Sequence, residues 1–266
     1  MNGNQLNAKS APPAQPQGRA SVPVYKGFTL IELLAVIAII GLLAGLVVGL
    51  SGLAVTKQRE ARMRAEHARL VTGIEAYKAD LGFYPSENTN TVLVKSPENE
   101  DFDLRVGKSP LFYELSGAIF SNDNGGQFTT LHNDRTVKVT DLAAALGVRG
   151  VQNSSRDKKN VPYRGINFKP SQFAELDGSQ GVQLLVTPLK GPYDSYFKVQ
   201  GSSATMNPWF YRLTPTKDAA GKILVGMHNP EGFDLWTEYL AGSKKIFTNG
   251  VSTVVPATKV IGNWKE

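Results

Sequence analysis

Two neighbouring features of the sequence could take part in chemistry: the Gly27-Phe28 peptide bond and the Glu32 carboxylate. Lys26 and Gly27 stand directly before Phe28, and Glu32 lies inside the long apolar run that follows. A carboxylate in an apolar environment is costly unless it has a partner. Cutting the chain after Gly27 would create an α-ammonium on Phe28, four residues before Glu32. The expected chemistry is therefore cleavage of one peptide bond, after which the new amine can pair with Glu32.

Glu32 also has two simpler interpretations. Thr29-x-x-Glu32 fits a capping box at the start of a helix, and this interpretation is compatible with the ion pair because both place Glu32 at a helix N-terminus. An ordinary secretory signal, cut near Gly52-Leu53-Ala54, is a further competitor. We disfavour it because Glu32 would interrupt the apolar region of such a signal.

The remainder of the sequence contains no recognisable catalytic pattern. His67, His132 and His228 are the only histidines, and no two of them have the spacing of metal ligands. No nucleophile elbow, phosphate-binding glycine loop or zinc-protease motif is present, and the chain has no cysteine. We therefore expect neither enzyme activity nor a cofactor, and we expect His67 to be a packed histidine with one hydrogen bond.

Length and charge set broad limits on the protein. The 266 residues suffice for one good core or two small domains. Residues 1–27 are rich in Pro, Gln, Ala, Asn and Ser and are predicted to be a leader peptide. Because this leader holds three cations and no acid, its removal would lower the formal net charge from +6 to +3. Such a balance gives little support for nucleic-acid binding, which we do not expect.

A membrane helix is predicted for residues 28–56. Leu33 to Leu50 form 18 residues without a charged or polar side chain, the minimum length of a spanning helix. Lys26 before the run favours a cytoplasmic N-terminus, although a group of cations directly after the run opposes that orientation. These cations are Lys57, Arg59, Arg62 and Arg64.

Three glycines in this helix are spaced four residues apart: Gly41, Gly45 and Gly49. On a helix they form one stripe of small residues, which lets a second helix approach closely. We interpret the stripe as a helix-packing surface, although glycine is also common in membrane helices for other reasons.

The helix is predicted to continue as an amphipathic segment over residues 57–86. Apolar residues and one histidine recur there at alternating spacings of four and three, which is the period of a helix with one buried face. The stripe consists of Met63, His67, Leu70, Ile74, Tyr77 and Leu81. A helix from Phe28 to about Leu81 would be roughly 80 Å long. Gly82 and Pro85 supply the stop.

The remaining sequence is predicted to form a small antiparallel sheet. Residues 87–190 are a region of short mixed segments with one candidate helix, from Asp141 to Val148. Residues 191–266 contain strand-like runs separated by Gly and Pro, at 195–199, 209–213, 223–225 and 233–237. The fold class is therefore α+β, in which a long N-terminal helix, first transmembrane and then amphipathic, packs on a small antiparallel β-sheet.

The opening motif resembles a known processing site. Lys26-Gly27-Phe28-Thr29-Leu30-Ile31-Glu32, with the apolar run behind it, is similar to that of type IV pilins and type II secretion pseudopilins. The resemblance implies a pilin-like fold and implies that a prepilin peptidase cuts between Gly27 and Phe28 and N-methylates Phe28. It also implies that Glu32 meets the Phe28 amine of a neighbouring subunit during assembly.

Shorter matches narrow this resemblance to the major pseudopilins. Phe83-Tyr84-Pro85-Ser86 resembles their Tyr-Pro step, and three segments resemble their sheet region: 207–211, 232–236 and 261–264. Residues 87–190 are longer than the corresponding part of that family and look like an insertion. The family also implies an acidic calcium loop, yet Glu238 is the only acid between Trp236 and Trp264. Because calcium prefers several carboxylate oxygens, we expect no such site, although backbone carbonyls could also bind calcium.

What the resemblance implies is a structural subunit of a periplasmic pseudopilus for type II secretion. Its implied partners are the prepilin peptidase, identical and minor pseudopilins, and the inner-membrane secretion platform. The subunit would cross the bacterial inner membrane once, with its N-terminus in the cytoplasm and its C-terminal domain in the periplasm. Two alternatives remain open: a type IV pilin of a surface filament, and a membrane-anchored binding module or enzyme.

Overall fold

The computed structural model of the chain describes residues 27–96, 100–163, 165–248 and 251–264. For residues 46–54, 248 and 251 it describes the backbone alone. The chain divides into two compact units, one ending at Gly52 and one beginning at Leu53. The second unit is called the body below.

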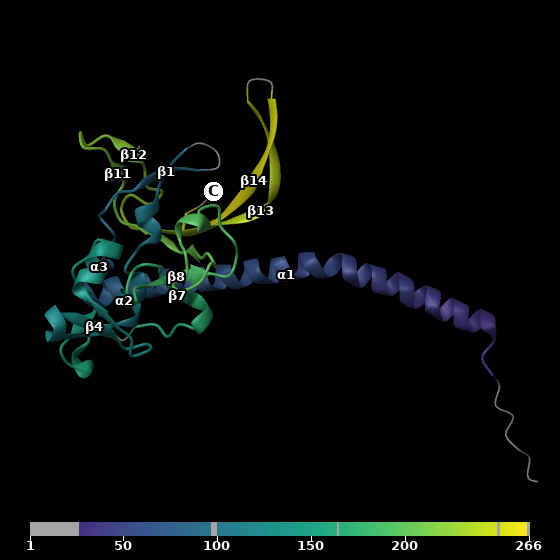
Figure 1. The fold of residues 1–266 in the computed structure, drawn as a ribbon, viewed down its shortest axis with the longest axis horizontal. Helices are drawn as coiled ribbons and strands as arrows, with labels where there is room; N and C mark the ends of the chain where they lie inside the picture. Colours follow the sequence, from purple (N-terminus) through teal and green to yellow (C-terminus); the bar gives the residue numbers. More distant parts are fainter. Residues whose placement is uncertain (1–26, 97–99, 164, 249–250, 265–266) are drawn as a thin grey trace, which may run out of the picture. The chain divides into compact units, whose positions relative to one another are not determined.

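The described residues include three α-helices and fourteen β-strands, most of which are short (Figure 1). The helices are α1 (Leu30–Leu81), α2 (Leu111–Ser116) and α3 (Val139–Leu146). The strands are β1 (Leu93–Lys95), β2 (Asp101–Asp103), β3 (Ala118–Ser121), β4 (Gln127–Thr130), β5 (Thr136–Lys138), β6 (Ser154–Ser155), β7 (Phe173–Glu175), β8 (Gln183–Thr187), β9 (Asn207–Pro208), β10 (Phe210–Arg212), β11 (Thr216–Lys217), β12 (Ile223–Val225), β13 (Asp234–Thr248) and β14 (Val251–Gly262).

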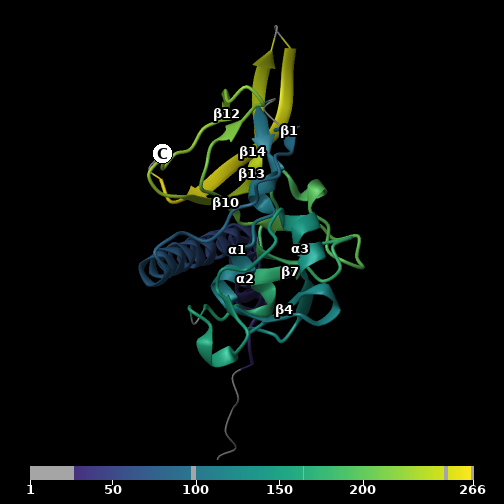
Figure 2. The same cartoon turned by 90° about the vertical axis from the view of Figure 1, so that its left-hand side faces the viewer.

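The α+β class predicted from the sequence is confirmed, but the strands form several small sheets in place of one. In the described residues the sheet orders are β5-β4-β3-β6, β7-β8-β9, β10-β13-β14, β1-β2 and β11-β12. All pairings are antiparallel except that of β3 with β6. The body is therefore built from several small sheets (Figure 2).

The C-terminal part of α1 packs into the body through the predicted apolar stripe. Met63, Leu70, Ile74 and Tyr77 are almost wholly buried, at the spacing of one helix face. The helix ends at Leu81, where Gly82 takes a positive φ of 85° and donates its N–H to the Lys78 carbonyl. A glycine adopts this left-handed conformation without the steric cost that other residues have. The predicted end of the helix, at Leu81 before Gly82, is therefore confirmed.

One hydrophobic cluster joins α1, the region 87–190 and the C-terminal strands. It includes Ile74 of α1, Leu111 of α2, Leu184 of β8 and Leu235 of β13. A buried polar contact links two of these parts, because the Tyr77 hydroxyl donates to Glu114 of α2 at 2.8 Å. Glu114 also accepts from the backbone N–H groups of residues 152 and 153, at 3.0 Å each. Region 87–190 thus contributes directly to the main core.

The strand predictions for the C-terminal part were only partly correct. β12 has the predicted bounds, and β10 and the start of β13 lie within or beside the predicted runs. The run 195–199 is not a strand: a short 3-10 helix, Asp194–Tyr196, occupies its start. There the Asp194 carboxylate accepts the Gly191 N–H at 3.0 Å, and this local bond favours a turn over an extended chain.

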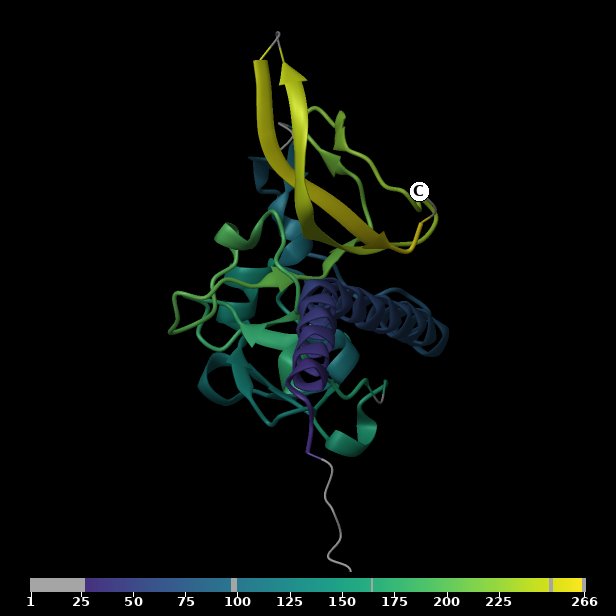
Figure 3. The same ribbon diagram turned by 90° about the vertical axis from the view of Figure 1, so that its right-hand side faces the viewer.

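The longest strands were not predicted in full. β13 and β14 form a hairpin whose pairing runs from Trp236 opposite Gly262 to Thr248 opposite Val251, with an irregularity between Leu240 and Ser243. β13 pairs with β10 only through its first three residues, and beyond Leu240 the described strands pair only with each other. The distal part of this hairpin stands clear of the other strands (Figure 3).

Candidate functional sites: a processing segment and a buried ion pair

The predicted cut lies in an accessible segment. Gly27, Phe28 and Thr29 have no regular secondary structure and precede the first turn of α1. Phe28 is 80% exposed, and a Cβ placed on Gly27 would meet no other atom within 4 Å. An extended, exposed backbone is what a peptidase needs in order to seat the bond that it cuts.

Glu32 closes a capping box with Thr29. Its carboxylate accepts the Thr29 N–H at 2.9 Å and the Thr29 hydroxyl at 2.8 Å, while the Thr29 hydroxyl accepts the Glu32 N–H at 3.3 Å. The simpler interpretation of Glu32 is therefore present in the uncut chain. The ion pair is a separate matter, because the Phe28 nitrogen belongs to a peptide bond until the chain is cut.

The first half of α1 exposes its apolar side chains. Ile31, Leu34, Ile37 and Leu42 are each more than half exposed. A Cβ added to Gly41 or Gly45 would meet no atom within 4 Å, whereas the surroundings of Gly49 lie outside the described side chains. The use of the three glycines in helix packing stays a prediction. Over the part of the chain that the structure describes, no helix combines the length and hydropathy of a membrane-spanning segment.

His67 is the packed histidine that its place on the apolar stripe predicted. Its Nε2 lies 2.9 Å from the Leu235 carbonyl oxygen of β13, and its ring contacts that of Trp209 at a centroid distance of 5.7 Å. The neighbouring Glu66 accepts a hydrogen bond from the Trp209 indole at 3.2 Å. Burial lowers the pKa of His67, and the Arg64 charge adds to this, while the bond to Leu235 opposes it.

This burial predicts acid sensitivity of the body. Because the folded-state pKa of His67 lies below its ordinary value of 6.5, the unfolded chain binds the proton more readily. The free energy of unfolding should fall as the pH drops below about 6.5 and stop responding to His67 below its folded-state pKa. His67→Gln should flatten this dependence by at most one proton, about 1.4 kcal/mol per pH unit. Urea unfolding from pH 7 to pH 5 measures it, and parallel curves for both proteins would contradict it.

The second site is an ion pair buried where β10 meets β13. Arg212 and Asp234 are paired across the two strands, and the Arg212 Nη2 lies 3.0 Å from the Asp234 Oδ2. Their side chains are 4% and 0% exposed. The Arg212 guanidinium also lies 5.3 Å from the ring of Trp236. Such a pair is costly to desolvate and is stable only when further hydrogen bonds satisfy its remaining atoms.

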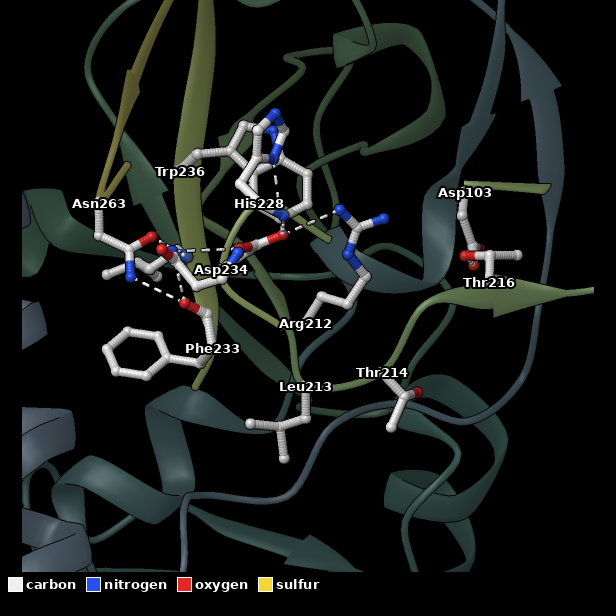
Figure 4. A network of polar contacts seen from close by, with 12 residues as sticks. Asp103, Arg212, Leu213, Thr214, Thr216, His228, Phe233, Asp234, Trp236 and Asn263 are labelled. Atoms are coloured by element: carbon white, nitrogen blue, oxygen red, sulfur yellow. Dashed lines mark hydrogen bonds and ion pairs between the residues drawn. The ribbon is translucent and has the colours of Figure 1, made fainter. Parts of the chain in front are cut away.

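Backbone groups from the loop before β13 supply such bonds to Asp234 (Figure 4). Among the described residues the buried Arg212 Nε has no hydrogen-bond partner. Asp234 accepts the N–H groups of His228 and Asn229, each at 2.9 Å, and the Asn229 side-chain amide at 3.2 Å. Asn263 lies beside β13, accepts the Leu235 N–H at 2.9 Å and donates to the Phe233 carbonyl at 2.8 Å. The pair therefore fixes the loop 228–233 and the start of β13.

Arg212 and Asp234 were not predicted as a site, although a signal for them exists. Each stands alone among apolar neighbours, in Phe210-Tyr211-Arg212-Leu213 and Phe233-Asp234-Leu235. The argument that Glu32 needs a partner applies equally to them, since an isolated charge in a buried strand must be paired. What the sequence lacked was the strand register that places them opposite each other.

The segment that would hold a family-type calcium loop has another structure. Residues between Trp236 and Trp264 belong mostly to the β13–β14 hairpin, where backbone carbonyls are used in pairing, and Glu238 accepts a bond from the Trp236 indole at 3.3 Å. One carboxylate on a paired hairpin does not fit a calcium loop. Among the described residues, no three His, Asp or Glu side chains are grouped to hold a metal ion. The expectation of no calcium stays a prediction.

Comparison with known proteins bears on the processing segment. Residues 24–48 match the prokaryotic N-terminal methylation motif, a span that includes Gly27, Phe28 and Glu32. No curated protein and no solved structure matches the chain. The motif implies processing by a prepilin peptidase and membrane anchoring by the N-terminal helix. The chain thus carries the N-terminal signature of type IV pilin-like proteins that are cut and N-methylated at their first mature residue.

Proposed function

We propose that this protein is a pseudopilin, a structural subunit of a periplasmic filament that serves type II protein secretion. The observation that carries the proposal is the position of Glu32, a lone carboxylate in the apolar start of α1, four residues after the residue whose amine processing would release. Pairing of Glu32 with the Phe28 amine of a neighbouring subunit would remove the cost of an unpaired charge and set the register of the subunits.

The choice of a pseudopilin over a surface pilin rests on the C-terminal segments. The segments 207–211, 232–236 and 261–264 follow one another in the order of the similar segments of major pseudopilins. Tyr84-Pro85 comes directly after the helix, as the Tyr-Pro step does in that family. The absence of cysteine also favours this choice, because many surface pilins close a C-terminal loop with a disulfide. In this proposal α1 anchors the subunit in the inner membrane and the body lies in the periplasm. Minor pseudopilins and the inner-membrane secretion platform are its further partners.

Variants of Glu32 and Thr29 distinguish the effect of the ion pair on assembly from the effect of the capping box. Glu32→Ala should permit cleavage but impair assembly. Glu32→Gln should do the same, because the amide oxygen still caps the helix while the charge is lost. Thr29→Ala, which removes the capping hydroxyl and keeps the carboxylate, should assemble. Filament yield is measured by shearing and sedimentation, and processing by the mass of the mature chain. Normal yield from Glu32→Gln would refute the ion-pair mechanism.

The same preparations distinguish the alternatives. Long surface filaments in electron micrographs would show a type IV pilin in place of a pseudopilin. A wild-type protein that stays monomeric after processing would show a membrane-anchored binding module or enzyme. Short filaments that depend on the secretion platform are the result expected of the proposed function.

A further inference from the structure

A group of cations follows the apolar part of α1 and takes no part in the proposed assembly contact. Residues 33–56 are 24 residues without a charge, and the next eight residues hold four cations and one acid. The cations are Lys57, Arg59, Arg62 and Arg64, and the acid is Glu60. Cations directly after an apolar segment oppose an orientation in which that side of the chain crosses the membrane. Their presence therefore requires a separate explanation.

Two of the four cations share the single acid. The Lys57 Nζ lies 3.4 Å from the Glu60 Oε2, and the Arg64 Nη2 lies 3.0 Å from the Glu60 Oε1. These partners are three and four residues apart, the spacings at which side chains are neighbours on a helix surface. Glu60 therefore neutralises part of the charge of Lys57 and Arg64 within α1 itself.

Arg59 and Arg62 are the other two cations. Both are exposed, and neither forms an ion pair with any residue that the structure describes. The next acid along the helix, Glu66, accepts instead from the Trp209 indole at 3.2 Å. Because Arg59 and Arg62 are three residues apart, their side chains leave the helix side by side, with about 5–6 Å between Cβ atoms. Two guanidinium groups at this separation offer several N–H donors to one anion.

The distance of this arginine pair from the start of the apolar segment matches the depth of lipid phosphates. The hydrocarbon part of a bilayer is about 30 Å thick, and the headgroup regions bring the total to about 40–45 Å. At 1.5 Å per residue, the 24 uncharged residues 33–56 cover roughly 36 Å. Arg59 and Arg62 follow within the next two turns, so an anchored helix would place them among the headgroups. A lipid phosphate is an acceptor that guanidinium groups bind with two parallel hydrogen bonds.

We propose that Arg59 and Arg62 bind the phosphate of an anionic phospholipid, such as phosphatidylglycerol, at the point where α1 leaves the bilayer. The inference rests on the membrane anchoring that belongs to the proposed function, and it adds a lipid site outside the contact of Glu32 with a neighbouring subunit. It holds for either orientation of the chain, because both surfaces of a bilayer carry phosphate groups. A bound headgroup keeps α1 of the unassembled subunit at one depth in the membrane.

Lipid binding is measured on the full-length chain, purified as an unassembled subunit in a neutral detergent. Equal amounts of phosphatidylglycerol and phosphatidylcholine are added, and native mass spectrometry gives the ratio in which the two lipids stay bound. The unchanged chain should retain more phosphatidylglycerol. Arg59→Gln combined with Arg62→Gln should lower this preference about fivefold for each arginine removed. Glutamine has a high helix propensity, so α1 should stay intact, which circular dichroism checks.

The matched control is Lys158→Gln combined with Lys159→Gln. These two lysines are exposed, lie in the body outside α1, and change the net charge by the same amount when they are replaced. This control should keep the preference for phosphatidylglycerol. Inorganic phosphate, added at the same ionic strength as a chloride control, should not displace the lipid, because it lacks the acyl chains that pack on the apolar part of the helix.

Three results would overturn the lipid site: an unchanged preference in the arginine variant, an equal loss in the lysine control, or displacement of the lipid by inorganic phosphate. Sedimentation of filaments from the same variants separates the lipid site from the proposed function. An arginine variant that keeps the lipid preference but loses filament yield would show that the two arginines pair with a neighbouring subunit, which also overturns the inference. A lipid preference in an unchanged chain that forms no filaments would refute the proposed function alone.

Discussion

Replacing Gly27 with leucine is expected to leave the chain uncut, so that its mass in the membrane stays that of the precursor. Gly27 lies in an exposed, irregular segment directly before α1 and has no Cβ to keep a peptidase from its carbonyl carbon. A leucine side chain at the residue before the cut would hinder this approach. Intact-mass spectrometry of the membrane fraction distinguishes the precursor from the mature chain, because the precursor retains its 27 leader residues.

The matched control is Gly41→Leu, the same substitution inside α1. It should be cut as efficiently as the unchanged chain, because it lies beyond the processing segment. If the stripe of Gly41, Gly45 and Gly49 packs against a neighbouring helix, this control should nevertheless lose filament yield. If the Gly27→Leu variant has the mass of the mature chain, cleavage does not depend on Gly27 and the assigned cleavage site is wrong.

Replacing Asp234 with alanine should destabilise the body by about 3–5 kcal/mol, because Arg212 would remain buried and unpaired. The His228 and Asn229 N–H groups would also lose their acceptor. Asp234→Asn should lose less stability than Asp234→Ala, because the Asn amide oxygen can still accept hydrogen bonds from the loop N–H groups. Thermal and urea unfolding, followed by tryptophan fluorescence, measure the difference.

Two further variants test whether the unpaired buried charge of Arg212 causes this loss of stability. Lys95 and Asp101 form an ion pair of similar length, 2.8 Å, whose side chains are 60% and 41% exposed, so Lys95→Ala should cost no more than about 1 kcal/mol. Arg212→Met combined with Asp234→Asn should be more stable than Asp234→Ala, because no buried charge is left over. Equal losses from the buried pair and the exposed pair would contradict the explanation.

The amphipathic half of α1 and the processing segment were predictable because their signals are local. The 3.6-residue period of Met63, Leu70, Ile74 and Tyr77 depends only on helix geometry, and the glycine that ends the helix follows the stripe directly. The processing segment is a continuous motif. Its identification needs no knowledge of what lies elsewhere in the fold.

The hairpin and the turn at 194–196 show where local patterns were insufficient. Asn249-Gly250 between two β-prone runs was an available signal for a hairpin, but the prediction ended the strand at Thr237. At Asp194 the aromatic alternation favoured a strand, whereas one side-chain bond to the Gly191 N–H favoured a turn. A pattern of residue types does not show which of the two has the lower free energy.

The ion pair and the stacking of Phe102 on Tyr193 both depend on long-range pairing. Arg212 and Asp234 are 22 positions apart and meet only because β10 pairs with β13. Phe102 and Tyr193 stack on each other although 87–190 and 191–266 were predicted as separate regions. Long-range pairing of this kind follows from the whole fold, so no window of sequence contains it.

The side-chain bonds along α1 also determine how the body would bear tension. A pull along the helix axis reaches the body through bonds of His67 to Leu235, Trp209 to Glu66 and Tyr77 to Glu114. Glu66 and His67 lie in one turn of α1, and Tyr77 lies about three turns further along the helix. Load applied parallel to such a row is shared among its members, so several bonds must break together before the helix slides. Rupture force in a single-molecule experiment should therefore depend on the whole row and change little when one of its bonds is removed.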